Sequence, residues 1–207
     1  MNEPSFGDRY AASQLARRDS GVRARVKQLY LDRILRFATG VTVDVGCGAG
    51  QLLEQLPAGS IGIEVNPALV AALRSRGLHV MQVAGDPSTI SLGTLQPGVA
   101  STVVLSHVLE HFDDAARVLR RLMVDCSALG VSRLIIVVPG AVGYRSDATH
   151  RTFVTLDYLA AHGLLDGDGC RVVHGSFFPG NLQAIGRLFI YHELMVVYEL
   201  DATRAGR

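Results

Sequence analysis

The stretch VTVDVGCGAGQLLEQL, residues 41–56, joins a run of β-branched residues to a turn rich in glycine. Residues 41–45 predict a short buried strand of a parallel sheet, because β-branched side chains favour strands and buried parallel strands are apolar on both faces. Three alternating glycines follow at once: Gly46, Gly48 and Gly50. Without a Cβ atom, they let the backbone adopt angles that other residues avoid and lie close to a ligand. The apolar spacing beyond them predicts a helix over 50–56, ending at Pro57.

Predicted strands and helices alternate along most of the remaining chain. The apolar runs predict further strands at 60–65, 78–83, 101–108, 132–140, 171–178 and 194–200. Helical spacing predicts helices at 8–38, 67–75, 113–128 and near 155–163. This alternation is typical of an α/β fold, and we expect a Rossmann-like, doubly wound, mostly parallel sheet with helices on both faces.

We expect one domain over residues 1–207, since no linker, repeat or low-complexity segment divides the chain. Residues 1–39 are predicted to form an N-terminal helical lid, in which the segment around Tyr10 and Arg18 folds over a ligand. Residues 141–180 are rich in glycine, aspartate, histidine and aromatic residues. They predict an insertion on the substrate side of the sheet, near the strand ends.

The composition excludes several classes of protein. Hydrophobic residues make up 48% and charged residues 19% of the chain, which is typical of a soluble globular protein. The net charge of +1 provides no basic field, so nucleic acid is not an expected partner. Three cysteines without a CxxC pair predict a reducing, cytoplasmic location. Neither a signal peptide nor a membrane span is expected, because the long apolar runs that they require are absent from the sequence.

The polar residues at the predicted strand ends indicate a ligand site, because open α/β sheets bind ligands beyond the C-terminal ends of their strands. Glu64 ends the second strand, where a carboxylate can accept hydrogen bonds from both hydroxyls of a ribose. Asp44 precedes the glycine turn, where it would repel a pyrophosphate and attract a cationic amino group. The third glycine also comes one residue earlier than in the dinucleotide motif Gly-x-Gly-x-x-Gly. A helix starting after the turn would add N–H groups to the site.

Four motifs, spread over about residues 40–140, resemble those of class I S-adenosylmethionine-dependent methyltransferases. VDVGCGAG resembles the first motif, GIEV the second, VAGDPSTI the third and LSHVLEHF the fourth. The resemblance implies S-adenosylmethionine as the cofactor, Glu64 as the ribose ligand and Asp86 as a neighbour of the adenine. The full set of implied cofactor-binding residues is Asp44, Gly46, Cys47, Gly48, Glu64, Val65, Asp86 and Ser106. Gly85 and Pro87 depart from the commonest form of the third motif.

Several of these residues also have a purely structural interpretation. Asp44 can cap the glycine turn through backbone N–H groups, and Glu64 can be a solvated strand end. Cys47 is better explained as a small apolar turn residue than as a nucleophile, since no partner base lies beside it in sequence.

Methyl transfer from a sulfonium is an in-line displacement, and alignment of the two reactants supplies much of its rate. A hydroxyl acceptor must also lose its proton, which requires a general base or a metal ion. SHVLEHF places His107 and His111 four residues apart, just after the fourth strand. The resemblance places His107 beside the acceptor and assigns Glu110 a partly structural role. His111 is a candidate base or metal ligand, or else a packed histidine.

YRSDATHRTF, residues 144–153, follows the fifth predicted strand and is expected over the same pocket. Asp147 and His150 are three residues apart, which suits a carboxylate–imidazole pair or two ligands of one magnesium or manganese ion. We therefore take Asp147 and His150, together with His111, as candidate catalytic residues. Tyr144 and Arg145 are expected to line the acceptor pocket. The alternative is a loop that Asp147 holds by capping the next turn.

These observations predict a methyltransferase that acts on a hydroxyl of a sugar, a glycoside such as a polysaccharide precursor, or a similar small metabolite. One alternative is a subunit that binds S-adenosylmethionine without catalysis, and another is an enzyme for a lipid, phenolic or other natural-product acceptor. A nucleotide-cofactor oxidoreductase is opposed by Asp44 and the early third glycine. A nucleic-acid methyltransferase is opposed by the near-zero charge. The exposed late strand predicts a homodimer.

Overall fold

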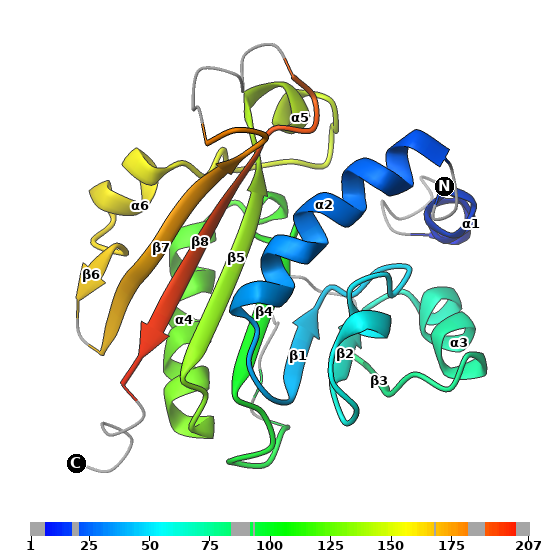
Figure 1. Ribbon diagram of the computed structural model, residues 1–207, viewed down its shortest axis with the longest axis horizontal. Coiled ribbons are helices and arrows are strands. Elements are labelled where there is room, and N and C mark those ends of the chain that lie inside the picture. The colour runs from blue at the N-terminus through cyan, green and yellow to red at the C-terminus, as the bar shows by residue number, and fades with distance from the viewer. Residues whose placement is uncertain are drawn as a thin grey trace.

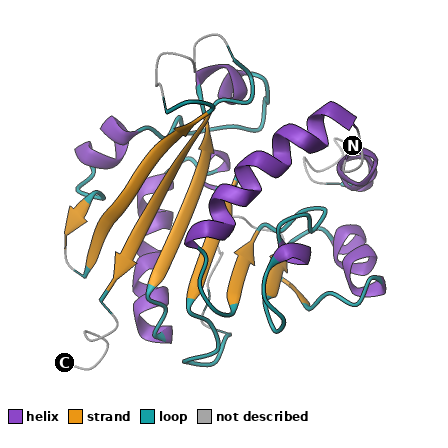
Figure 2. Ribbon diagram, viewed as in Figure 1, coloured by secondary structure: helices purple, strands orange, loops and turns teal. Residues whose placement is uncertain are grey.

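The computed structural model describes residues 7–17, 21–83, 92, 94–167, 169–181 and 189–201. The described chain forms an eight-stranded sheet in the order β3-β2-β1-β4-β5-β8-β7-β6, with helices on both faces (Figures 1 and 2). The expected doubly wound, mostly parallel α/β fold is confirmed. The strands are β1 (Thr42–Val45), β2 (Ile61–Glu64), β3 (Val80–Gln82), β4 (Thr102–Ser106), β5 (Arg133–Pro139), β6 (Asp166–Gly167), β7 (Cys170–Phe178) and β8 (Glu193–Leu200).

The sheet reverses its winding between β1 and β4. From β1 the chain moves outward through β2 to β3, and it then returns to pair β4 in parallel with the other side of β1. β5 continues parallel to β4, whereas β8 inserts antiparallel between β5 and β7. Connections that diverge at such a switch point leave space beyond the strand ends, and ligands bind there in open α/β sheets.

Two apolar cores cover the two faces of the sheet. Successive residues of a strand point to opposite faces, so Val103 and Leu105 pack on the side of α4 (Ala115–Leu129). Val104 packs on the other side, with Ile34 from α2 (Gly21–Phe37). Burial on both faces explains why the central strands are continuous apolar runs rather than alternating ones.

The remaining helices are short. Within the described residues they are α1 (Asp8–Arg17), α3 (Pro67–Ser75), α5 (Ala141–Arg145), α6 (Leu156–Ala161) and the 3-10 helices η1 (Leu53–Gln55) and η3 (Leu109–His111). α3 has the predicted bounds because Asn66 caps it, accepting hydrogen bonds from the N–H groups of Ala68 and Leu69. Pro67 then occupies the first helical turn, where its missing N–H is not needed.

Two of the predicted helices are wrong in extent. The helix expected over 50–56 is only the single turn η1, because Pro57 and the left-handed Gly50 leave too few residues for an α-helix to nucleate. The glycine turn therefore has no α-helix N-terminus directly behind it. The helix expected over 8–38 is two helices, α1 and α2, and α2 begins at Gly21, a residue with poor helix propensity.

The segment 141–180, expected as one insertion, is not one structural unit. Its first part, with α5 and α6, lies beyond the end of β5, whereas its last part forms β6 and β7 of the central sheet (Figure 1). β7 pairs with β8 along its length, and its second neighbour in the sheet is the two-residue β6. No helix among the described residues is long and apolar enough to span a membrane.

Candidate active site

The glycine turn after β1 is held against the end of β2. Gly46, Gly48 and Gly50 all have positive φ, at 69°, 53° and 78°. The N–H groups of Gly46 and Cys47 donate to the carbonyl of Ile63, at 2.8 and 3.1 Å. Glu64 Oε2 accepts a hydrogen bond from the N–H of Gly48 at 2.9 Å. Glu64 of the second motif thus holds the glycine turn of the first motif in place. Both motifs lie beyond the strand ends near the switch point of the sheet.

The three glycines differ in what a side chain would meet. A Cβ on Gly46 would lie 2.6 Å from Cγ2 of Val108, and one on Gly50 would collide with Leu73. A Cβ on Gly48 would have, among the described residues, only the Gly46 carbonyl within 4.0 Å. Gly46 and Gly50 are therefore needed for packing, whereas the space beside Gly48 is available to a ligand.

A cavity of about 210 Å³ lies over this turn. Asp44 and the residues of the turn line it from the end of β1, and Ser106 and His107 line it from the end of β4. Residues from the N-terminal helices also line it: Gln14, Lys27, Tyr30 and Leu31. Thus the structure brings together five of the expected cofactor-binding residues: Asp44, Gly46, Cys47, Gly48 and Ser106.

The N-terminal helices bound this cavity, as a lid would. The cavity is smaller than the roughly 300–1,000 Å³ of most small-molecule sites. The role of these helices as a lid stays a prediction. Arg18 and the side chain of Tyr10 lie outside the described residues, and so does Asp86, which was expected near the adenine.

Acidic side chains predominate around the cavity. Four carboxylates are buried there or next to it: Asp44, Glu64, Glu110 and Glu193. Lys27 and His107 are basic side chains that line the same cavity. Burial raises the pKa of Asp44 to about 7, a shift that Lys27 opposes and Glu64 supports. Burial also lowers the pKa of Lys27. Such a site favours a cationic ligand over a pyrophosphate.

His107 is held between two of these carboxylates. Its Nδ1 lies 3.2 Å from Glu110 Oε1, and its Nε2 lies 3.1 Å from Glu193 Oε1. Burial lowers the pKa of His107, but the two carboxylates outweigh it and raise the pKa to about 10. At neutral pH the ring is an imidazolium, which donates hydrogen bonds and cannot act as a general base. Its φ of 58° is unusual for a residue with a side chain, and such conformations concentrate at functional sites.

Asp147 and His150 do not form the expected pair. Asp147 Oδ1 accepts hydrogen bonds from the hydroxyl and the N–H of Thr149, at 2.7 and 2.9 Å. Thr149 Oγ1 lies 3.1 Å from His111 Nδ1, so Asp147 orients His111 through Thr149. His150 instead donates from Nδ1 to the carbonyl of Tyr144 at 2.8 Å, and its Nε2 lies 3.9 Å from Glu110 Oε1. The i, i+3 spacing suggested a direct contact that the turn in this loop prevents.

The two histidines nevertheless come together, with ring centroids 4.9 Å apart. Tyr144 stacks on His150 at a centroid distance of 5.5 Å. Arg145 is exposed, and its Nε donates to the carbonyl of Ala141 within α5. Of the two residues expected to line the acceptor pocket, only Tyr144 reaches the histidine cluster.

Four residues of the site were missed as cofactor or catalytic residues: Lys27, Tyr30, Glu110 and Glu193. Lys27 is the single lysine of the chain, but its rarity does not indicate where it lies in the fold. Glu110 lies between two histidines in the fourth motif and was assigned a partly structural role. Glu193 lies 86 residues after His107, so no local pattern could pair them. Cys47 is buried, and burial raises the pKa of its thiol, which fits its interpretation as a turn residue.

Comparisons with known proteins agree with this site. Residues 43–123 match the family model described as a methyltransferase domain. A SAM dependent methyltransferase from Archaeoglobus fulgidus is 19% identical, with a TM-score of 0.63 over 93% of this chain and 100% of that chain. Magnesium protoporphyrin IX methyltransferase from Synechocystis PCC 6803, with bound SAH, is 14% identical, with a TM-score of 0.63 over 95% of this chain and 96% of that chain. N-methyltransferase NodS from Bradyrhizobium japonicum WM9, in complex with S-adenosylhomocysteine, is 18% identical, with a TM-score of 0.61 over 93% of this chain and 97% of that chain. No curated protein sequence matches the chain.

Residues 43–123 match a methyltransferase domain, and the strand order and the glycine turn fit the class I S-adenosylmethionine-dependent methyltransferases. The resemblance seen in the four motifs is thereby confirmed. The residues present fit the cofactor, because the space beside Gly48 admits a ligand and the buried carboxylates suit its positive charge.

Cofactor affinity is expected to depend on pH through Asp44. Below a pKa of about 7 the carboxyl is protonated, and binding of a cationic amino group must release that proton. The dissociation constant of S-adenosylmethionine should therefore fall about tenfold between pH 6 and pH 8. Isothermal titration calorimetry across this range measures the effect, and Asp44→Asn should give a flat profile. A flat profile in the unmodified protein would contradict the role of Asp44.

Proposed function

We propose that this methyltransferase transfers the methyl group to a hydroxyl of a sugar, a glycoside such as a polysaccharide precursor, or a similar small metabolite. The observation that carries the proposal is the pair His111 and His150, held side by side next to the cofactor cavity. An amine acceptor needs little help, whereas a hydroxyl must lose its proton as it attacks.

The surroundings of His111 favour a neutral imidazole. Burial lowers its pKa, Glu110 acts in the opposite direction and His150 lowers it further. A neutral imidazole is the form that accepts a proton near neutral pH. The contact through Thr149 to Asp147 would orient the ring and stabilise the imidazolium that forms.

Bound S-adenosylmethionine supplies an electrophilic methyl carbon attached to a sulfonium sulfur. His150 or His111 would accept the proton of the acceptor hydroxyl while the oxygen–carbon bond forms and the carbon–sulfur bond breaks, leaving its electron pair on sulfur. His107, as an imidazolium at the cavity wall, would hydrogen-bond to the acceptor or the cofactor. Ser106 lies beside it on the same wall.

The polar loop after β5 supports a hydroxylated acceptor. Asp147 and Arg145 are exposed there, and Tyr144 offers an aromatic face beside His150. The same fold serves a methyltransferase of magnesium protoporphyrin IX and an N-methyltransferase, so lipid, phenolic and other natural-product acceptors are the rival outcomes of the test. We also propose a cytoplasmic enzyme, in keeping with three cysteines that form no CxxC pair, and a homodimer formed through the sheet edge at β7 and β6.

The test is methyl transfer from labelled S-adenosylmethionine to a panel of sugars, glycosides, phenols and amines, with product identification by mass spectrometry. We expect transfer to a sugar or glycoside hydroxyl. Transfer only to phenols or amines would overturn the sugar assignment. Cofactor binding without transfer to any acceptor class would overturn catalysis and favour a binding subunit.

Glu64→Ala is expected to weaken S-adenosylmethionine binding by about 1–3 kcal/mol, the scale of hydrogen bonds to a charged group. The carboxylate accepts from the N–H groups of Gly48, Val65 and Asn66, so the substitution also releases the glycine turn. A 2′-deoxyribose analogue of S-adenosylhomocysteine separates the two effects. If Glu64 binds the ribose, Glu64→Ala should weaken binding of this analogue less than it weakens binding of S-adenosylhomocysteine.

The matched control for this prediction is Glu54→Ala, which removes an exposed carboxylate of η1 that pairs with Arg76. It should leave cofactor affinity unchanged. Unchanged affinity in Glu64→Ala would remove Glu64 from the site.

A further inference from the structure

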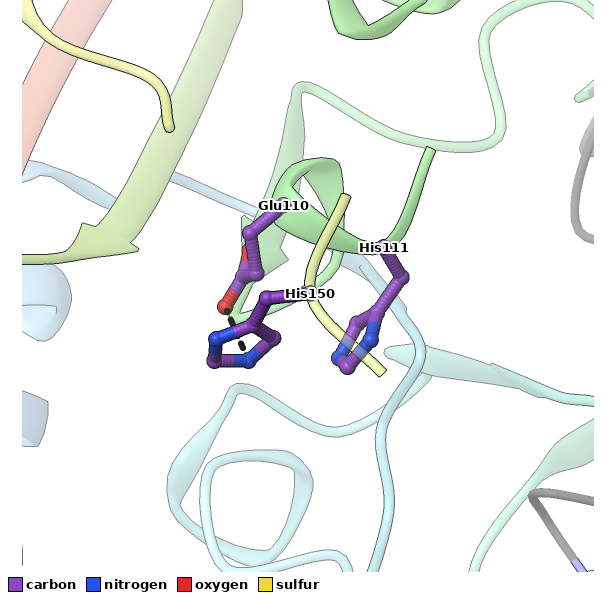
Figure 3. A group of neighbouring side chains, drawn as sticks. All are labelled: Glu110, His111 and His150. Carbon is purple, nitrogen blue, oxygen red and sulfur yellow. Dashed lines mark ion pairs between the residues drawn. The ribbon is translucent and has the colours of Figure 1, made fainter. Parts of the chain in front are cut away.

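The side chains of Glu110, His111 and His150 lie close together (Figure 3). Glu110 contacts His107, which lines the cofactor cavity. Glu110 and His111 belong to η3, which follows β4, and His150 belongs to the loop after α5. Each side chain offers one ligand atom, and these atoms lie within 4.8 Å of one another. Neighbouring strand ends therefore bring two imidazoles and one carboxylate together from segments about forty residues apart in sequence.

The contacts around the two rings resemble those of metal-binding histidines. His150 donates from Nδ1 to the carbonyl of Tyr144 at 2.8 Å, which leaves the lone pair of its ring on Nε2, the nitrogen that faces Glu110. Thr149 donates its hydroxyl proton to Asp147, and its oxygen lies 3.1 Å from His111 Nδ1. The ring of His111 also hydrogen-bonds to the backbone of Thr149. A ring that donates from Nδ1 here would have its lone pair on Nε2. A histidine that ligates a metal usually donates its other ring N–H to a carbonyl or carboxylate in this way.

The carboxylate of Glu110 is the second observation that indicates a ligand. The side chain is fully buried, and its Oε2 has no hydrogen-bond partner among the described residues. Its other oxygen faces His107 at 3.2 Å and His150 at 3.9 Å. An unpartnered oxygen makes a buried carboxylate costly, and a cation bound by the carboxylate of Glu110 and the two imidazoles would lower the cost of burying its negative charge.

We propose that Glu110, His111 and His150 form a binding site for one divalent first-row transition-metal ion. Two imidazole nitrogens and one carboxylate suit Zn²⁺ or Fe²⁺ better than Mg²⁺, which prefers oxygen ligands. Ligands about 2.0–2.2 Å from Zn²⁺ lie roughly 3.4 Å apart, so ligand atoms within 4.8 Å of one another must approach by up to about 1.4 Å on binding. Asp147, expected from sequence as a ligand, supports His111 through Thr149 instead.

Three protein ligands leave open coordination positions, as in catalytic metal sites. The catalytic role of the ion rests on the proposed function: it would bind the acceptor hydroxyl and favour loss of its proton to solvent. The oxygen would then form its bond to the methyl carbon as the carbon–sulfur bond breaks toward sulfur. The ion would thus replace an imidazole base in activating the acceptor.

The test is titration of the EDTA-treated full chain with Zn²⁺ in isothermal titration calorimetry, checked by metal analysis after dialysis. We expect one ion per chain and a loss of affinity of at least 100-fold in Glu110→Gln and in His150→Ala. Thr149→Val removes the hydroxyl that links His111 to Asp147 but no proposed ligand, and it should cost about 10–100-fold. His162→Gln is the matched control: this exposed histidine also contacts a carbonyl, that of Tyr158, through Nδ1 at 2.8 Å, and it lies outside the cluster.

Less than one ion per chain, or equal affinity in Glu110→Gln and the unmodified chain, would overturn the site. Circular dichroism shows whether each variant is folded, and Thr149→Val tests the site if Glu110→Gln does not fold. The proposed hydroxyl acceptor and the proposed metal site can be disproved independently of each other. Zn²⁺ binding without methyl transfer to a hydroxyl would overturn the acceptor assignment alone, and transfer unaffected by EDTA in a chain that binds no Zn²⁺ would overturn the metal site alone.

Discussion

His150→Ala is expected to lower the turnover number about 100-fold or more while the dissociation constant of S-adenosylmethionine changes little. Removing a general base or a metal ligand has an effect of this size, because the acceptor hydroxyl keeps its proton. His150 does not line the cofactor cavity, so the cofactor should bind as before. Steady-state kinetics with the best hydroxyl acceptor, together with calorimetry of cofactor binding, measure the two effects separately.

The control variant for His150→Ala is again His162→Gln, which should retain full turnover. His150 also packs against Tyr144 and is largely buried, so the thermal unfolding of His150→Ala must be compared with that of the unmodified chain. Full activity in a folded His150→Ala would transfer the role of base to His111. Activity lost together with cofactor binding would mean that His150 supports the structure rather than the chemistry.

Gly48→Ala is expected to weaken cofactor binding about 5–150-fold, the range that 1–3 kcal/mol of steric conflict produces. The added methyl group meets no side chain in the part of the chain that the structure describes, and Gly48 lines the cavity, so the methyl group should enter the space that the cofactor needs. The free energy of unfolding should fall by only about 1–2 kcal/mol, the cost of a left-handed backbone at a residue with a Cβ. Calorimetry and urea denaturation measure the two quantities.

Gly46→Ala is the matched comparison in the same turn, since its φ is also positive but its Cβ would lie 2.6 Å from Val108. Strain and overpacking together should lower its free energy of unfolding by about 2–5 kcal/mol. If Gly48→Ala binds the cofactor normally, the space beside Gly48 is not the cofactor site. If both variants lose only stability, the turn has a structural role alone.

The order of strands and helices could be predicted because it depends on local patterns. Apolar runs such as Val103 to Leu105 are long enough to indicate buried strands, and the cap at Asn66 with Pro67 defines the start of α3. The helix expected over 50–56 was wrong because apolar spacing does not reveal that a left-handed Gly50 and Pro57 leave one turn between them. Local propensity is a weak guide where a segment is shorter than a stable helix.

Only those parts of the candidate site that are short, continuous sequence motifs could be predicted. Asp44, the glycine turn and the fourth motif are short patterns, and the structure places them around one cavity. The pairing of Asp147 with His150 was inferred from spacing, but loop geometry directs Asp147 to Thr149 instead. Whether a side chain points toward its neighbour depends on backbone angles that spacing does not specify.

By itself, the sequence determined the α/β fold, the cofactor class and the strand ends at which the site lies, because hydrophobic periodicity and the glycine turn are local properties of the chain. Only the tertiary structure decided which charged groups share the site. It placed Glu193 on β8 against His107 after β4, Lys27 of α2 near Asp44, and His150 beside Glu110. These contacts join distant segments at strand ends that the sheet brings together, and burial there then sets the charge of each group.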